Sequence, residues 1–257
     1  MNRVALVTGA ARGIGAATVR ALAADGWCVV AVDRAGDDPR LPYALGTAMQ
    51  LEALRSDAVL PLAADICDPV ALAGTVAEAE RAFGGLDAAI AVAGVVAGGV
   101  PLWDQPDHEV RAVIDVNLFG VIELARASVP ALLRRPVPRS GRFLAVASTA
   151  AFRGLPMLAA YCAAKAGVGG LVRALAVELG GTGVTANAVS PGSTDTMVLA
   201  ESARLYGLRS AQEFALQQPL GRLVLPEEVA AALVWFAGPG SAVVTGAVLP
   251  VDGGLAL

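Results

Sequence analysis

The chain has 257 residues, of which 56% are hydrophobic and 16% are charged, and its net charge is −4. This length predicts one domain, residues 1–257, because it lies near the size at which a single core stops growing. The negative charge argues against general nucleic-acid binding. Apolar runs are cut by Gly, Pro or a charge before the ~18–20 residues of a membrane span, and no signal sequence is visible, so we expect a cytoplasmic protein.

Seven short apolar runs alternate along the chain with helix-length, Ala-rich segments. They are VALVTG (4–9), CVVAVD (28–33), AVLPLAAD (58–65), LDAAIAVAG (86–94), RFLAVAST (142–149), VTANAVSPG (184–192) and AVLPVDGG (247–254). This alternation predicts βαβ units and a parallel sheet, and continuous apolar runs predict strands covered on both faces. The expected fold class is α/β, a doubly wound parallel sheet or Rossmann fold.

A glycine-rich turn, VTGAARGIG, joins the first run to the helical segment AATVRALAADG. Its glycines, Gly9, Gly13 and Gly15, would let the backbone approach a pyrophosphate at a helix N-terminus, beside Arg12 and Ile14. A strand–turn–helix context makes this a dinucleotide-binding prediction, since glycines alone occur in many tight turns.

The second run ends in Asp33, where a carboxylate can accept hydrogen bonds from ribose hydroxyls. It would repel a 2′-phosphate, which favours NAD over NADP. Arg12 or Arg34 could pair with that phosphate, and Asp33 could simply cap a loop. Asp65 and Ile66, after the third run, would flank the adenine.

Tyr161 and Lys165 stand four residues apart and would share one helix face. A nearby ammonium favours phenolate and lowers a tyrosine pKa toward the range useful for proton transfer. Ser148 ends the fifth run, at the sheet edge where ligands bind, and its hydroxyl could polarise a carbonyl oxygen. Asn117 lies inside a predicted helix, where it could bend the helix and hold a water that relays protons to Lys165. An ordinary surface Tyr–Lys pair is the alternative.

These motifs together resemble the classical short-chain dehydrogenase/reductase family over essentially the whole chain. The resemblance rests on Gly9 to Gly15, Asn117, Ser148, the Tyr161–Lys165 pair, NAVSPG (187–192), PLGRLVLPEEVA and TGAVLPVDGG. It implies Tyr161 as acid/base, Ser148 as ligand of the substrate oxygen, Lys165 on the nicotinamide ribose and Asn117 as anchor of the water relay. It also implies that Pro191, Gly192, Thr194 and Thr196 line the nicotinamide and phosphate side, and that the protein is a homotetramer.

One motif departs from the family. After the fourth run the family usually has NNAG, and this chain has AVAG (91–94). Ala93 and Gly94 would still contact the cofactor, but side-chain hydrogen bonds from two asparagines are lost. We expect a change in local support and no loss of activity.

The segment 34–50 is longer than the family's usual link and predicts a loop. Within it, LPYALGTAMQLEAL is similar to an insertion in the mycofactocin-associated branch of the family. That resemblance implies a lid that holds NAD without free exchange, with an external redox carrier to receive the electrons. The alternative is an ordinary long surface loop.

The segment 193–222 predicts a helical flap over an apolar pocket that excludes water. The expected pocket residues are Val95, Val96, Trp103, Phe152, Leu155, Met157, Met197, Leu199, Leu205, Tyr206, Leu208 and Phe214. They point to a hydrophobic secondary alcohol or ketone as substrate. Arg153 and Arg209 could meet an acidic substrate group, although solvated charges are the plainer interpretation.

The sequence is compatible with two other functions. The nearest enzyme is an NADPH-dependent 3-oxoacyl-carrier-protein reductase, which Asp33 disfavours. A rival of another class is a non-catalytic, nucleotide-sensing binding protein, which would not need all four catalytic residues. Three scattered cysteines fit reduced thiols, and no metal-ligand spacing is apparent, so no metal site is expected.

Overall fold

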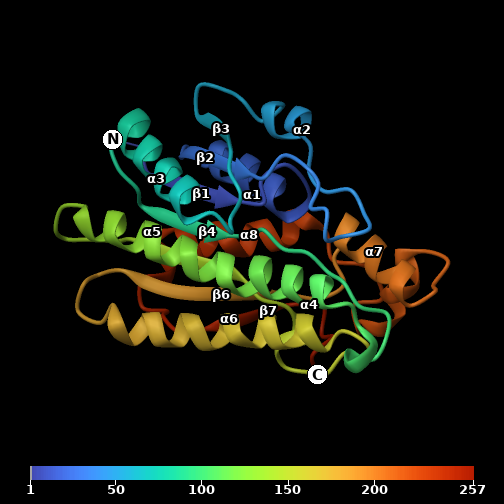
Figure 1. The fold of residues 1–257 in the computed structure, drawn as a ribbon. Helices are drawn as coiled ribbons and strands as arrows, with labels where there is room; N and C mark the ends of the chain where they lie inside the picture. Colours follow the sequence, from blue (N-terminus) through green and yellow to red (C-terminus); the bar gives the residue numbers. More distant parts are fainter. Residues whose placement is uncertain (1) are drawn as a thin grey trace.

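A parallel seven-stranded sheet forms the centre of the computed structural model, which describes residues 2–257 (Figure 1). Its strands are β1 (Val4–Thr8), β2 (Cys28–Asp33), β3 (Val59–Ala63), β4 (Ala88–Ala91), β5 (Arg142–Val146), β6 (Thr185–Pro191) and β7 (Val248–Val251). Their order is β3-β2-β1-β4-β5-β6-β7. All seven predicted strands are present, and the doubly wound Rossmann fold is confirmed.

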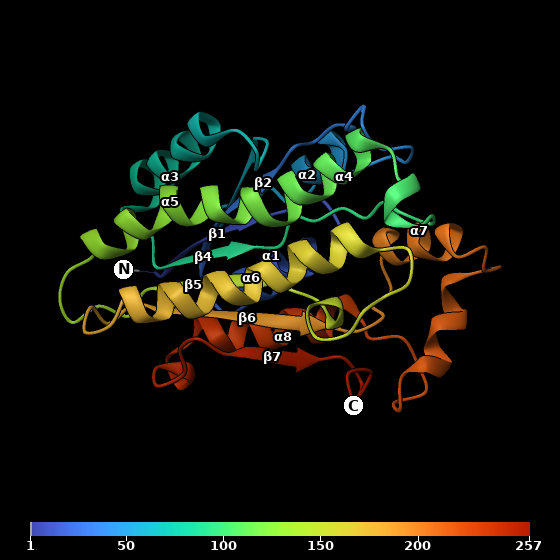
Figure 2. The same ribbon diagram turned by 60° about the horizontal axis from the view of Figure 1, so that its bottom comes forward.

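Helices cover both faces of the sheet. They are α1 (Gly13–Ala24), α2 (Ala48–Glu52), α3 (Pro69–Phe83), α4 (Asp107–Ile114), α5 (Gly120–Arg134), α6 (Ala159–Glu178), α7 (Met197–Leu205) and α8 (Pro226–Ala237), with short turns η1 (Leu102–Asp104), η2 (Asp115–Phe119), η3 (Thr149–Ala151), η4 (Ala211–Gln217) and η5 (Pro239–Ser241). The helices α3, α4, α5 and α6 lie on one face, and α1 and α8 lie on the other (Figures 1 and 2).

Alternate side chains of each central strand enter opposite layers. In β1, Leu6 packs into the cluster beneath α3, α5 and α6, whereas Val7 packs into the cluster beneath α1 and α8. Both are fully buried. A strand buried on two faces needs apolar residues at every position, which accounts for the high apolar content of a protein with few charges.

Two of the helices are long and apolar enough to cross a membrane by length and composition. They are the continuous helix Asp107–Arg134 and the helix Ala159–Glu178. Scattered charges and glycines interrupt each apolar stretch, so neither helix contains an uninterrupted apolar run of the length expected for a membrane span. Both helices pack on the sheet and contribute buried residues such as Leu124 and Val168 to its core, as helices of a Rossmann layer do.

The loop predicted at 34–50 is three residues too long. Thr47 begins α2 with a capping box: its side chain accepts from Gln50 N, and Gln50 Oε1 accepts from Thr47 N. The reciprocal pair satisfies two amides at the helix start, so Ala48 to Gln50 are helical. The helical flap predicted at 193–222 contains α7 and η4.

The carboxyl ends of the strands gather at one end of the molecule. The arrowheads of β4, β6 and β7 point to the end where α7 lies (Figure 2). Strand order reverses between β1 and β4, which are neighbours in the sheet. Such a switch point leaves a crevice above the strand ends, and this places the ligand site of a doubly wound fold.

The fold makes a stability prediction at Asn187, a fully buried residue of β6. Its Nδ2 donates to Val244 O (2.8 Å) and its Oδ1 accepts from Ala247 N (3.0 Å), which ties β6 to the segment before β7. Asn187→Ala leaves both backbone groups unpaired, so we expect a loss of ~2–4 kcal/mol in the free energy of unfolding.

The matched control is Thr245→Ala, since the exposed Thr245 accepts from Ala186 N nearby. Water can replace that hydroxyl, so the expected loss is under ~1 kcal/mol. Denaturant unfolding measures both variants, and equal losses in the two would contradict the assignment.

Candidate functional site

A cleft of about 1000 Å³ opens at the carboxyl edge of the sheet. It is lined by every residue predicted to contact the cofactor: Gly9, Arg12, Gly13, Ile14, Gly15, Asp33, Asp65, Ile66, Ala93, Gly94, Tyr161, Lys165, Pro191, Gly192, Thr194 and Thr196. Ser148 lines it as well, but Asn117 does not. The fold thus brings the predicted cofactor-binding residues, which are distant in sequence, to one cleft.

The glycine turn between β1 and α1 leaves no room for side chains. Gly9 has φ +67°, and an added Cβ would lie 2.6 Å from the Cα of Ala93. A Cβ on Gly15 would collide with the carbonyl oxygen of Gly9. The backbone therefore presents the bare N-terminus of α1 to the cleft, a cradle that fits the pyrophosphate of a dinucleotide.

Asp33 lies at the end of β2, beside this turn. Its Oδ2 accepts from Ala11 N and its Oδ1 from Ala35 N, each at 3.0 Å. These bonds fix the carboxylate at the cleft wall, and each oxygen keeps a free lone pair for a ribose hydroxyl. The loop-capping role and the ligand role are compatible.

Both arginines that could bind a 2′-phosphate have other partners. Arg34 Nη1 lies 3.0 Å from Asp38 and 3.3 Å from Asp65. Arg12 donates to the carbonyls of Ala44 and Leu45. Since their donors face protein oxygens, neither guanidinium stands free beside Asp33.

The segment 34–47 is fastened across the cleft rather than loose in solvent. Arg40 joins the buried Asp38 (2.8 Å) to Asp115 (2.7 Å), in the helical layer. The Tyr43 hydroxyl accepts from Val96 N (2.9 Å), and burial raises the pKa of this phenol to about 12. In Figure 1 this segment runs from β2 toward α7, above the strand ends. It spans the side of the cleft where the cradle and Asp33 lie.

Ser148, Tyr161 and Lys165 meet at the other end of the cleft. Ser148 caps η3, and its Oγ accepts from Ala150 N (3.2 Å). Tyr161 and Lys165 project from the start of α6, and Lys165 Nζ lies 5.8 Å from the centre of the tyrosine ring. Lys165 is buried and donates to Val146 O (2.9 Å) at the end of β5.

The protonation of this pair differs from the sequence expectation. Burial raises the pKa of Tyr161, and a hydrogen bond with Ser148 opposes the rise. Burial also lowers the pKa of Lys165, to about 8. The expected lowering of the tyrosine pKa by Lys165 is therefore not met, because the desolvation of the phenol dominates.

Asn117 lies directly behind the cleft, in the π-helical turn η2 between α4 and α5. Its Nδ2 donates to Val95 O and Val113 O (2.8 Å each), and its Oδ1 accepts from Val95 N (3.2 Å). A relay water would have to share Oδ1 with Val95, so the relay remains a prediction. The three hydrogen bonds of Asn117 hold the helical layer to the loop after β4, and we call this contact the Asn117 clamp. A Cβ on Gly94 would lie 3.0 Å from Asn117 Oδ1 and 3.5 Å from Lys165 Nζ.

Thr8 supports the segment that lacks the family's two asparagines. Its Oγ1 accepts from Val92 N (3.2 Å) and Ala93 N (3.4 Å), which links the end of β1 to the end of β4. Sequence reasoning missed Thr8, although its place in the Val-Thr-Gly run at the switch point was a usable signal.

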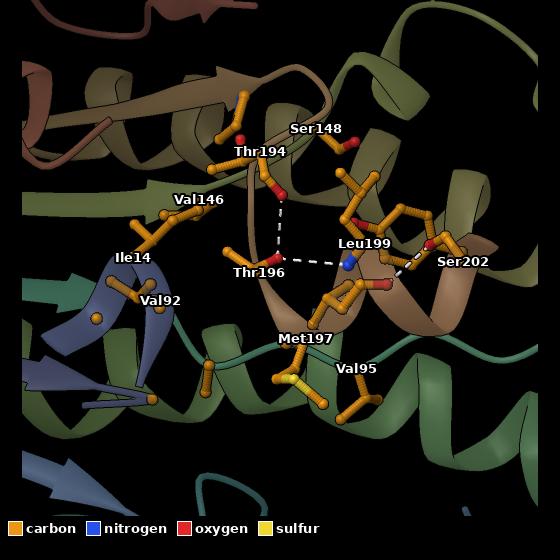
Figure 3. Close-up of a pocket in the computed structure, with 18 of the residues that line it drawn as sticks. Ile14, Val92, Val95, Val146, Ser148, Thr194, Thr196, Met197, Leu199 and Ser202 are labelled. Carbon is orange, nitrogen blue, oxygen red and sulfur yellow. Dashed lines mark hydrogen bonds between the residues drawn. The ribbon is translucent and has the colours of Figure 1, made fainter. Parts of the chain in front are cut away.

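The turn after β6 forms one wall of the cleft. Gln218, buried and also missed from sequence, accepts from Ser193 N (2.9 Å) and donates to Arg222 O (2.6 Å). Thr196 then caps α7 by accepting from Leu199 N (Figure 3). These bonds hold Thr194 and Thr196 above the cradle.

The predicted apolar pocket is correct in part. Val95, Leu155, Met197, Leu199, Tyr206, Leu208 and Phe214 line the cleft, and Figure 3 shows Met197 and Val95 pointing toward each other. Val96, Trp103, Phe152, Met157 and Leu205 do not line it. Trp103 is 85% exposed on η1, outside the cleft. Among residues 2–257, no group of three or more His, Cys, Asp or Glu side chains could hold a metal ion.

Known proteins resemble this chain along nearly its full length. The family model described as Enoyl-(Acyl carrier protein) reductase matches residues 9–256. The chain is 38% identical over 255 residues to cis-4-hydroxycyclohexanecarboxylate dehydrogenase of Sinomonas cyclohexanicum, covering 98% of this chain and 96% of that one. It is 33% identical over 255 residues to an NAD(+)-dependent 2-dehydro-3-deoxy-L-rhamnonate dehydrogenase of Sphingomonas sp. (strain SKA58), covering 98% and 95%.

A solved structure agrees with this likeness. Carveol dehydrogenase from Mycobacterium avium, in complex with NAD, superimposes with a TM-score of 0.91 at 31% identity, covering 98% of this chain and 97% of that one. Sequence match, strand order and cleft geometry point the same way. The chain belongs to the classical short-chain dehydrogenase/reductase family of oxidoreductases.

Proposed function

We propose that this protein is an NAD-dependent dehydrogenase that interconverts a hydrophobic secondary alcohol and its ketone, with Tyr161 as acid/base. The observation that carries the proposal is the meeting of Ser148, Tyr161 and Lys165 in the cleft that also holds the glycine cradle and Asp33. A sensing protein on this fold would have no use for that constellation. The arginines that a 2′-phosphate would need are engaged elsewhere, which disfavours the NADPH-dependent carrier-protein reductase.

NAD is the cofactor that best fits the site. The carboxylate of Asp33 suits an unphosphorylated adenosine ribose and repels a 2′-phosphate. The carveol and rhamnonate relatives are NAD proteins by name, which supports the same choice. When bound, NAD supplies the hydride acceptor, C4 of its nicotinamide ring.

The proton steps belong to the protein's own residues. Ser148 Oγ would hold the substrate oxygen, so that its proton lies in reach of the Tyr161 oxygen. In alcohol oxidation, phenolate at Tyr161 takes the hydroxyl proton while the carbinol carbon loses hydride; in ketone reduction, the phenol returns a proton to the new alkoxide. Lys165 would hold the nicotinamide ribose, and below pH 8, where it is an ammonium, its charge would offset part of the cost of a buried phenolate. Because burial raises the pKa of Tyr161, oxidation should speed up as pH rises.

The substrate wall suits a compact, largely apolar alcohol. Leu155, Met197, Leu199 and Phe214 line the same cleft as Ser148 and Tyr161. Such a wall favours substrates by burial of apolar surface and excludes water from the reacting carbon. The named substrates of two relatives, carveol and cis-4-hydroxycyclohexanecarboxylate, are cyclic secondary alcohols, so we propose a cyclic substrate.

The segment 34–47 is proposed as a lid that retains NAD, as in the mycofactocin-associated branch of the family. Its ties through Arg34, Arg40 and Tyr43 cross the cofactor side of the cleft and would have to break before a bound nucleotide could leave. A lid acts mainly by slowing dissociation. The electrons would then pass to an external redox carrier. We also propose a cytoplasmic homotetramer.

The substitution Tyr161→Phe tests the acid/base role of the tyrosine. Removing the phenol oxygen removes the proton acceptor, so turnover of a cyclic secondary alcohol should fall by at least ~10²-fold. Steady-state assays of wild type should also show oxidation accelerating from neutral to alkaline pH, and the residual rate of the variant should lose this dependence. Wild-type turnover in the variant would contradict the role of Tyr161 as acid/base.

The proposed lid is tested by what the purified protein carries. Purified protein should carry nicotinamide that is released only on denaturation, detected by mass spectrometry. Arg40→Ala removes the link between the lid and Asp115, so the variant should retain less NAD and respond more strongly to added NAD. Arg55→Ala, which removes an exposed pair with Glu52 on the neighbouring α2, is the control and should behave as wild type. Wild type that purifies without nicotinamide, and turns over only with added NAD, would refute the lid.

Burial of Lys165 makes the stability of the fold depend on pH. The pKa of Lys165 is lowered to about 8 in the fold, below the 10.5 of an unperturbed lysine. Below pH 8 the buried ammonium therefore destabilises the native state by about 3 kcal/mol, and this cost fades as pH rises to 10.5. Lys165→Met also loses the bond to Val146, so at pH 7 it should gain ~2 kcal/mol and melt a few degrees higher while being inactive.

Thermal melts at pH 7 and pH 10.5 measure this effect. The advantage of Lys165→Met should disappear at the higher pH. A melting temperature for the variant at or below that of wild type at pH 7 would show that the ammonium carries no such cost.

A further inference from the structure

Arg153 is a charged residue on the substrate side of the cleft that the mechanism does not use. It follows Ser148 by five residues, and its backbone N–H donates to Thr149 O (3.1 Å) in the turn η3. The turn that places the Ser148 hydroxyl over the strand end thus also fixes the position of Arg153 at the mouth of the cleft. Arg153 lines the same cleft as Ser148 and Tyr161.

The guanidinium is held by the C-terminal segment. Arg153 Nη1 donates to Leu255 O (2.6 Å). That carbonyl belongs to a tight turn held by the buried Asp252, which accepts from Gly254 N and Ala256 N (2.9 Å each). One bond of five possible donors anchors the side chain, and the other donors have no protein acceptor in the described chain.

No acidic partner neutralises this charge. Among residues 2–257 the salt bridges join other arginines to Asp and Glu, and none includes Arg153. Its neighbours along the cleft wall are apolar or small, among them Gly154, Leu155 and Pro156. An anchored, unpaired guanidinium beside an apolar wall is a typical receptor for a carboxylate, which it can bind through two parallel hydrogen bonds.

We propose that Arg153 binds an anionic group of the substrate and so selects secondary alcohols that carry a carboxylate at the end remote from the hydroxyl. This inference rests on the proposed alcohol oxidation at Ser148 and Tyr161. In this arrangement the apolar body of the substrate lies against the wall, and its two polar ends meet Tyr161 and Arg153. Because Arg153 is exposed to solvent, it contributes selectivity among alcohols and takes no part in proton transfer.

The test compares matched substrates in wild type, Arg153→Gln and Arg209→Gln. The substrates are 3- and 4-hydroxycyclohexanecarboxylate, each with its primary amide, and kcat/KM is measured for every pair. Glutamine at 153 keeps a polar N–H donor on a shorter side chain but carries no charge. Arg209 is also exposed near the wall, next to the lining Leu208, but does not line the cleft, so its variant controls for a general loss of positive charge.

Wild type should prefer at least one acid over its amide, and Arg153→Gln should lower that preference tenfold or more, chiefly through KM. Arg209→Gln should leave it as in wild type. A preference unchanged in Arg153→Gln, including an equal fall for acid and amide, would overturn the inference, and so would a wild type that prefers both amides. If the amides are oxidised and the acids are not, the proposed alcohol oxidation stands and only the role of Arg153 fails. If no alcohol is oxidised, both fail.

Discussion

The clamp that Asn117 forms on Val95 is the contact on which the site depends. The amide closes hydrogen bonds to both the N–H and the carbonyl of Val95, and to Val113 in the preceding helical turn. It thereby fixes where the chain goes after β4, at the point where strand order reverses. Glycine suits position 94, because a Cβ there would lie only 3.0 Å from Asn117 Oδ1, which the clamp holds in place. The π-helical turn η2 directs the Asn117 amide inward, so that this amide connects the helical layer to the strand ends.

Most charged side chains in this cleft are paired with an opposite charge or with a backbone oxygen. Arg12 and Arg34 are directed at oxygens of the segment 34–47 and of Asp65, which leaves Asp33 to act as a carboxylate. Within residues 2–257 the buried Lys165 has a carbonyl and no carboxylate as partner, and its lowered pKa reflects the cost of burying the charge. Catalytic sites often retain such a buried, desolvated ammonium at the expense of stability. Arg153, at the cleft mouth, is anchored by the carbonyl of Leu255.

The sequence specifies the framework well, because its signals are local. Each strand is a short apolar run bounded by Gly, Pro or Asp, and the glycine turn, Ser148, Tyr161 and Lys165 sit at strand ends or on one helix face, where spacing alone determines position. Features made by distant residues were out of reach. The bonds from Thr8 to β4, from Gln218 to Ser193 and from Tyr43 to Val96 depend on tertiary packing. Likewise, the pKa of Tyr161 follows from burial, which spacing to Lys165 does not report, and Trp103 looked like a pocket residue only because apolar residues usually lie inside.

Transfer of deuterium from a labelled alcohol shows whether the protein passes hydride directly to its nicotinamide. The protein, with its nicotinamide, is incubated with a cyclic secondary alcohol deuterated at the carbinol carbon, then denatured, and the released nucleotide is examined by mass spectrometry. Direct hydride transfer predicts one deuterium on the nicotinamide ring, together with the matching ketone and no label in water. Ketone formed with an unlabelled nucleotide, or with the deuterium in solvent, would contradict the account.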